Sequence, residues 1–89
     1  MLELVSIEYV DESKLKARFS TGESGVVDLA DSLWGPVFEP LRDVELFKRF
    51  RLSPVLHTIA WDNDADFAPE YLRDTMFRQA EAVPARQHQ

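Results

Sequence analysis

The chain has 89 residues, 45% of them hydrophobic and 29% charged, which predicts one folded domain that buries roughly 60–65% of its unfolded surface and excludes a disordered chain. Because it contains no cysteine, disulfides, thiolate zinc sites and cysteine nucleophiles are excluded. With 16 acidic against 10 basic residues, the formal net charge is −6, which disfavours non-specific binding to phosphate backbones.

The first third of the chain carries strand patterns. Residues 4–10 and 14–20 alternate apolar and polar side chains, as half-buried strands do. The inward positions are predicted to be Val5, Ile7 and Tyr9 in the first strand and Leu15, Ala17 and Phe19 in the second. Gly22 can take the positive φ that the following hairpin turn requires. Residues 26–29 make a third strand, so the sequence predicts an antiparallel meander.

Turns follow the third strand. Asp31 is placed to cap a single helical turn, which Gly35 and Pro36 would end. The apolar residues Phe38 and Leu41 are expected to plug the space beneath the sheet.

A short helix and another strand are predicted next. Asp43 is an N-cap residue in front of VELFKRF, residues 44–50. Residues 56–61, LHTIAW, are β-branched and aromatic enough for a strand paired with residues 51–53, and His57 is expected inside it. The predicted fold is therefore α+β, a small antiparallel sheet of about four to five strands with two short helices.

The last helix begins at WDNDADFAPEYL, residues 61–72. Taking Pro69 as the first helical residue makes Ala68 the N-cap and spaces Phe67 and Leu72 as a hydrophobic staple. Glu70 in the first turn favours the helix dipole by roughly 0.3–1 kcal/mol.

The apolar positions of that helix form one stripe with Phe77 beside it. The stripe consists of Leu72, Met76, Ala80 and Val83. The helix is expected to end at Pro84. We therefore predict a single domain over residues 1–82 and a disordered tail over residues 83–89.

The three alternating aspartates Asp62, Asp64 and Asp66 raise the question of a cation site. A calcium loop counted from Asp62 fails where glycine and glutamate are required, because those positions hold Phe67 and Arg73. The aspartates stay candidates for a weakly held divalent ion or a small acidic active site. The pattern favours the simpler reading, a polar corner where a strand passes into a helix.

Other chemical signals are weaker. No catalytic residue and no cofactor are predicted. A metal site with two histidines is not expected either, because only one histidine lies in the ordered region. Trp34 and Trp61 are expected in the core. The basic clusters are Lys14, Lys16 and Arg18, and Lys48, Arg49 and Arg51. We interpret each cluster as a solvent-exposed face. Only if the two clusters formed one continuous patch would they indicate nucleic-acid binding.

Five motifs in register resemble the bacterial domain of unknown function 2442 family. They are FSTGE (19–23), VDL (27–29), FEPL (38–41), DVELF (43–47) and WDNDADFAPEYL (61–72), within roughly residues 3 to 73. The structural signature residues are Phe19, Gly22, Asp28, Leu41, Phe47, Trp61, Asp66, Pro69 and Leu72. Two positions depart from the family pattern, since Arg73 stands where tyrosine is frequent and Ala68 where serine or aspartate caps the helix.

The resemblance implies a compact α+β fold without established catalytic residues. Some relatives carry a helix-turn-helix region after this domain; this chain is expected to end before one, so direct DNA binding is not carried over. Family members often look like halves of small gene pairs, which implies toxin–antitoxin-type partnerships.

The sequence thus predicts a cytoplasmic, non-enzymatic protein-interaction module without a membrane segment. Its expected partner is another protein, with self-association through a sheet edge or the last helix as a corollary. The candidate contact residues are Asp62, Asp64, Glu70, Arg73 and Phe77. Two alternatives remain open, a divalent-ion binder or small enzyme using the acidic corner, and an accessory domain of a DNA-binding regulator.

Overall fold

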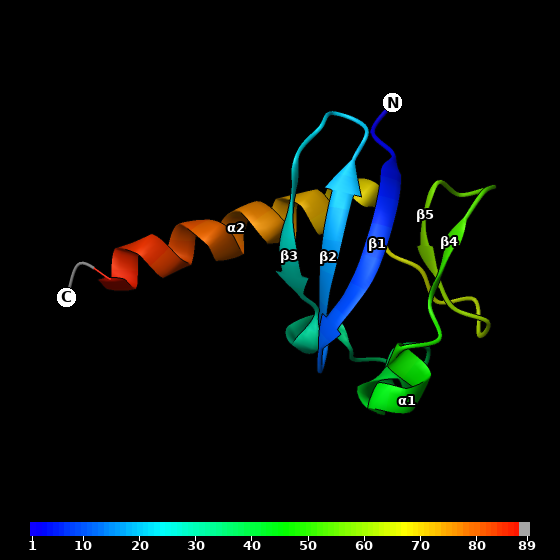
Figure 1. The fold of residues 1–89 in the computed structure, drawn as a ribbon. Helices are drawn as coiled ribbons and strands as arrows, with labels where there is room; N and C mark the ends of the chain where they lie inside the picture. Colours follow the sequence, from blue (N-terminus) through cyan, green and yellow to red (C-terminus); the bar gives the residue numbers. More distant parts are fainter. Residues whose placement is uncertain (88–89) are drawn as a thin grey trace.

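The computed structural model describes the backbone of residues 1–87 and the side chains of residues 1–81. Its elements are β1 (Leu4–Asp11), β2 (Lys14–Phe19), β3 (Ser24–Asp28), η1 (Ala30–Ser32), η2 (Glu39–Arg42), α1 (Val44–Phe47), β4 (Arg51–Ser53), β5 (Thr58–Ala60) and α2 (Pro69–Gln87). The α+β prediction is confirmed. The strands divide between an antiparallel three-stranded sheet, β1-β2-β3, and a separate hairpin, β4-β5, with α2 crossing behind the larger sheet (Figure 1).

The inward face of the three-stranded sheet follows the predicted alternation with one correction. Leu15, Ala17 and Phe19 of β2 are buried as predicted. In β1 the register shifts between Leu4, which pairs with Phe19, and Ser6, which pairs with Arg18. A residue inserted in this way changes the face to which its neighbours point. Leu4 is therefore buried, whereas Val5 is exposed.

The turns around β3 are also partly as predicted. Gly22 has a φ of 93° in the β2-β3 turn. The helical turn η1, however, is not capped by Asp31. The Asp28 carboxylate takes that place, because its Oδ1 accepts bonds from the Ala30 N–H (3.0 Å) and the Ser13 hydroxyl (2.9 Å). An aspartate two residues before the accepted N–H is the usual Asx-turn geometry.

The second half of the core is built by α1 and the β4-β5 hairpin. Asp43 caps α1 by accepting a 3.0 Å bond from the Glu45 N–H, as predicted, and Phe47 is fully buried. His57 was expected within a strand but lies in the hairpin turn at a φ of 58°. Its N–H donates to the Ser53 carbonyl (2.9 Å), which closes the turn before β5 begins.

The helix α2 supplies the other wall of the core. Leu72 and Met76 are buried beneath the sheet, whereas Ala80 is exposed. The helix runs to Gln87, past the end predicted at Pro84; proline removes one N–H, but its fixed φ is itself helical. The predicted disordered tail stays a prediction, and residues 88 and 89, like the side chain of Val83, lie outside the described part. None of the described helices combines the length and the apolar character that a membrane span requires.

Candidate functional site

The acidic corner is a tight reversal anchored by Trp61. The buried indole Nε1–H donates to the Phe47 carbonyl (2.8 Å). The chain turns back because the Trp61 N–H donates to the Ala65 carbonyl (2.9 Å) and the Asp64 N–H donates to the Trp61 carbonyl (3.1 Å). Asp64 takes a φ of 71° within this turn, a conformation that aspartate tolerates better than most residues.

After the reversal, the chain pairs with β5 and enters α2. Asp66 forms an antiparallel bridge with Ala60. The Thr58 hydroxyl donates a 2.5 Å bond to the carbonyl of the buried Phe67. The Leu72 N–H then donates to the Ala68 carbonyl (3.2 Å). The corner therefore leads from β5 into a helix that begins at Pro69, as predicted.

The three aspartates of the corner each make a different contact. Asp62 forms an exposed ion pair with Arg51 of β4, Asp64 belongs to the turn, and the backbone of Asp66 belongs to the bridge. Within the described residues, no group of three or more histidine, aspartate or glutamate side chains is arranged to hold a metal ion. The corner thus offers a divalent ion no assembled set of described ligands.

A series of aromatic rings leads from the core to the surface beside this corner. Trp61 lies 5.7 Å from Phe47 and 6.0 Å from Phe67, measured between ring centroids. Phe67 stacks on Phe38 at 4.7 Å and on Tyr71 at 5.4 Å. Such pairs contribute about 0.5–1.5 kcal/mol each beyond the area they bury. The stack holds Phe38 and Tyr71 in fixed positions at the surface.

These rings line a surface pocket of about 440 Å³, here called the aromatic groove. Its residues are Ser32, Trp34, Phe38, Asp66, Phe67, Ala68 and Tyr71. Trp34 is 69% exposed and Tyr71 40% exposed. The hydroxyls of Ser32 and Tyr71 share a 2.5 Å hydrogen bond that ties η1 to α2. Asp66 is the one acidic residue of this lining, which contains no lysine or arginine.

Trp34 lies on the surface, contrary to the prediction from the sequence. It was expected in the core, but it is 69% exposed and directly precedes Gly35, which takes a φ of 90°. Its position next to a Gly-Pro turn was the signal that should have weighed against burial, since turns run over the surface.

The predicted contact residues lie on two elements, the corner and α2. Asp62 and Asp64 lie in the corner, and Glu70 is exposed in the first turn of α2, next to Tyr71. Arg73 and Phe77 lie farther along α2, where the Arg73 guanidinium carbon is 5.4 Å from the Phe77 ring centroid. Glu70, Arg73 and Phe77 follow one another in α2 at spacings of three and four residues, which places them on one face of the helix.

Arg73 is held in place by Glu23, which precedes β3. The Arg73 Nε lies 2.8 Å from Glu23 Oε1 as an ion-pair contact, and its Nη2 donates a 3.4 Å bond to Oε2. A hydrogen bond from the Thr21 hydroxyl (2.7 Å) is the main cause that lowers the pKa of Glu23 below 4.5; Arg73 adds to it, and partial desolvation opposes it.

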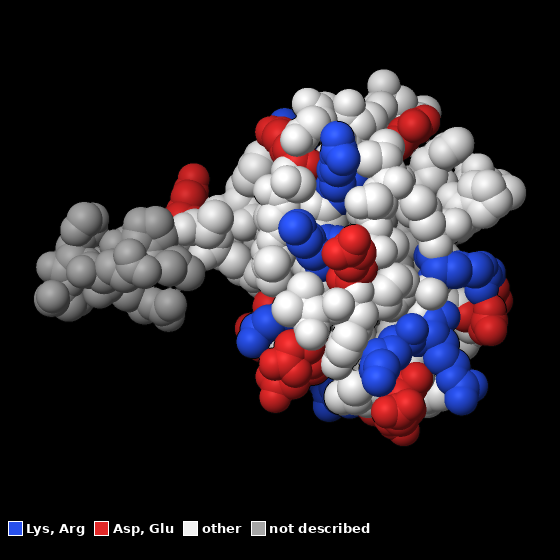
Figure 2. Space-filling view, in the orientation of Figure 1, with Lys and Arg blue, Asp and Glu red and all other residues white. Residues whose placement is uncertain are grey.

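The two basic clusters are interrupted by acids. Lys16 lies opposite Glu8 in the sheet, Lys48 is 3.9 Å from Glu45, and Arg51 pairs with Asp62. On the face shown in Figure 2, acidic side chains lie beside basic ones over the sheet and over α1. This face therefore presents mixed charge and not a continuous basic patch.

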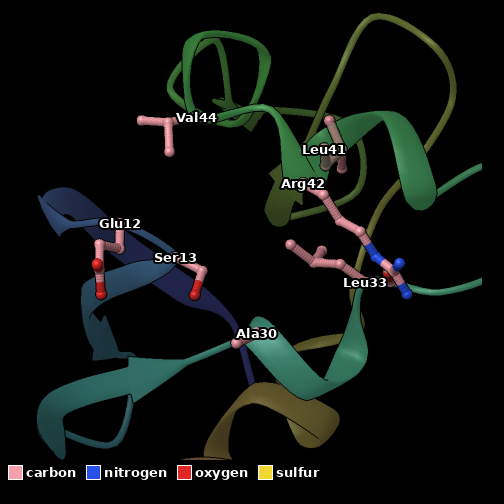
Figure 3. A pocket seen from close by; sticks show the side chains of 7 residues that line it. All are labelled: Glu12, Ser13, Ala30, Leu33, Leu41, Arg42 and Val44. Carbon is pink, nitrogen blue, oxygen red and sulfur yellow. The ribbon is translucent and has the colours of Figure 1, made fainter.

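A second pocket, of about 330 Å³, lies between the β1-β2 turn and the η2-α1 segment (Figure 3). Two of its polar groups are engaged elsewhere, since the Ser13 hydroxyl donates to Asp28 and the Arg42 Nε donates to the Leu33 carbonyl. Glu12 faces the pocket from the opposite side to Arg42. The pocket therefore assembles no pair of groups suited to acid–base or nucleophilic chemistry.

Comparison with known proteins supports the resemblance noted in the sequence. The family model described as "Protein of unknown function (DUF2442)" matches residues 4–77. A crystal structure of a "Putative DNA Binding Protein" from Nitrosomonas europaea is similar in fold, with a TM-score of 0.78 and 26% sequence identity. The similarity covers 91% of this chain and 52% of that one, so this chain spans about half the length of its structural neighbour. No curated protein is significantly similar.

Proposed function

Since the chain belongs to the DUF2442 family, whose description names no activity, we propose a function from the aromatic groove: the chain is a non-enzymatic protein-interaction module that binds a basic segment of a partner protein. The observation that carries this proposal is Trp34, a large aromatic side chain exposed at the mouth of an aromatic pocket. Tryptophan, tyrosine and arginine are the residues that dominate protein interfaces.

The chemistry of the groove suits an arginine or lysine side chain. A cation over the face of Trp34 or Tyr71 gains about 0.5–1 kcal/mol at an exposed site and about 2 kcal/mol when desolvated. The Asp66 carboxylate in the same lining offers an acceptor to the same cation. Arginine fits better than lysine, because its planar guanidinium both stacks on rings and bonds to a carboxylate.

The surrounding charge favours the same partner. Glu70 adjoins Tyr71 and Asp31 adjoins Ser32, and both acids are exposed. With a net charge of −6, the molecule would attract a basic segment at long range, an effect that acts mainly on the association rate. A neutralising role within a small bacterial gene pair, in the cytoplasm, is a special case of this proposal in which the partner is a basic protein.

The test uses three glycine-spaced pentapeptides, Gly-Arg-Gly-Arg-Gly and its lysine and glutamate counterparts, titrated into ¹⁵N-labelled protein. We expect shifts at the Trp34 indole N–H and at the amides of residues 66–68, 70 and 71, strongest with arginine. Trp34→Ala should weaken binding about 2- to 30-fold, the equivalent of one cation–π contact. Asp66→Asn should weaken it and reduce its salt dependence.

Val55→Ala is the matched control, because Val55 is 81% exposed and lies outside the groove; its affinity should equal that of the wild type. Equal binding by Trp34→Ala, or equal binding of the glutamate peptide, would refute the groove as the docking site.

The description of the Nitrosomonas protein favours a second candidate, an accessory domain of a DNA-binding regulator. Against direct DNA contact by this domain stand its net charge and the interrupted basic clusters described above. Fluorescence anisotropy with a labelled 20-base-pair duplex at low salt separates the two candidates. We expect no saturable binding; tight binding with a steep salt dependence would favour the DNA-binding alternative.

A further inference from the structure

The strand β3 is an open edge of the three-stranded sheet. On the opposite edge, β1 contacts the β4-β5 hairpin, and the Leu4 N–H donates to the His57 carbonyl (3.0 Å). Directly before and after β3, the Glu23 carbonyl accepts from the Phe19 N–H (2.9 Å) and the Leu29 N–H donates to the Ser13 carbonyl (3.0 Å), both toward the β2 side. Because backbone groups alternate in direction along an antiparallel strand, Ser24, Val26 and Asp28 direct theirs outward.

One of these outward positions already carries a substitute for a neighbouring strand. The Asp28 N–H donates to Gln79 Oε1 (2.9 Å), and Gln79 Nε2 donates to the Asp28 carbonyl (2.8 Å). This pair of bonds reproduces what the opposite residue of an added strand would make. Two residues earlier, the backbone of Val26 has no hydrogen-bonding partner among residues 1–81.

The helix α2 provides a floor beside this edge. It crosses behind β3 and continues beyond the sheet (Figure 1). Between the two elements lies a groove of about 430 Å³, to which Met76, Phe77 and Ala80 contribute from the helix. Val26 is 47% exposed and Phe77 39% exposed. The sheet therefore stops one strand short of the surface that its helix covers.

We propose that β3 accepts an extended segment of a partner protein as a fourth strand lying over α2. Its backbone would pair with Ser24 and Val26, and its inward side chains, small and apolar, would contact Phe77 and Ala80. This is strand addition, in which main-chain bonds give affinity and alternate side chains give specificity.

The charge of the outer sheet face sets the remaining specificity. Arg18 is flanked across the sheet by Ser6 and Ser24, and it forms no ion pair with a carboxylate of residues 1–81. In a strand added next to Ser24, the outward side chains would lie near the Arg18 guanidinium. Only the small side chain of Ser24 would separate them. The preferred segment therefore alternates acidic residues outward with apolar residues inward, unlike the basic partner proposed for the aromatic groove.

A second copy of this chain fits the edge poorly. The helix passes under Gly25, where Met76 Sδ would lie 3.0 Å from an added Cβ, and under Asp28 through Gln79. Symmetric pairing of two β3 strands about Val26 would bring both α2 helices into the same space. Gln79 would also block Asp28 in each copy. The geometry favours a partner segment that brings no helix of its own.

The test uses the peptide Ac-Glu-Val-Glu-Ala-Glu-NH₂, five residues like β3, and its Lys-for-Glu counterpart, with ¹⁵N-labelled protein. Saturating acidic peptide should slow amide exchange at Val26 at least tenfold and leave the Trp34 indole resonance unchanged. Gln79→Ala should tighten binding severalfold, because it releases the Asp28 backbone for pairing.

Two variants make the result decisive. Val26→Pro removes the outward N–H without removing a bond to β2 and should abolish binding, while protected Leu15 and Val27 amides confirm the fold. Arg18→Glu should reverse the preference toward the lysine peptide. Unchanged Val26 exchange, or unchanged peptide preference in Arg18→Glu, would overturn strand addition. Trp34→Ala should bind the acidic peptide normally, so this proposal and the aromatic groove succeed or fail separately.

Discussion

Replacing Thr58 by valine should destabilise the domain, although the two side chains have nearly the same shape. The buried Thr58 hydroxyl donates to the Phe67 carbonyl at 2.5 Å, and Phe67 is buried as well. Losing the donor leaves a buried carbonyl unsatisfied, which costs about 1–3 kcal/mol. Burial of the additional methyl group offsets about 0.8 kcal/mol. The net loss is about 0.2–2.2 kcal/mol, which lowers the Tm of a domain this size by roughly 1–18 °C.

Urea unfolding followed by far-UV circular dichroism measures the change, with Thr75→Val as the matched control. Thr75 is also buried, but its hydroxyl meets only a long 3.5 Å contact from the side chain of Arg78. Its replacement should change stability by less than about 0.5 kcal/mol. If Thr58→Val is as stable as Thr75→Val, the bond from the Thr58 hydroxyl to the Phe67 carbonyl contributes nothing to stability, which would refute the prediction.

Three further changes test other parts of the structure. Trp61→Phe removes the donor to the Phe47 carbonyl and leaves a small cavity, so urea unfolding should show a loss of about 2–4 kcal/mol; a loss below about 1 kcal/mol would contradict the anchor. Asp43→Ala removes the α1 cap and should lower the free energy of unfolding by about 1 kcal/mol in the same assay. An unchanged urea midpoint would show that the cap does not contribute to stability. Thr21→Val should raise the pKa of Glu23, because the Thr21 hydroxyl is the main cause that lowers it. The stabilisation from ionised Glu23 is present above pH 4.5 and is lost as pH falls through its lowered folded-state pKa; an NMR titration showing the same Glu23 pKa in both proteins would disprove this cause.

Local patterns predicted the elements whose stability is local. The alternation of apolar and polar residues predicted the buried face of β2, and Pro69 predicted the first turn of α2. The structure shows both. The bulge at Val5 was missed because a perfect alternation contains no sign of an inserted residue. It is visible only in the pairing of β1 with β2, where Leu4 pairs with Phe19 and Ser6 with Arg18.

The candidate site was harder to predict than the fold. Trp34 was assigned to the core by its hydrophobicity, yet apolar residues also make up much of a protein surface. The groove it lines draws on η1, the acidic corner and α2. The pairing of Gln79 with Asp28 joins residues 51 positions apart. Contacts of this kind are set by tertiary packing, and no window of sequence displays them.

Fluorescence of Trp34 during titration with the arginine pentapeptide tests the central claim most directly. Trp61 is buried and Trp34 is 69% exposed, so Trp34→Phe identifies the emission of the groove. Binding in the groove predicts a saturable change in Trp34 emission that weakens as salt increases and is absent with the glutamate peptide. Unchanged Trp34 emission, in a protein whose other resonances show that the arginine peptide binds, would contradict the claim.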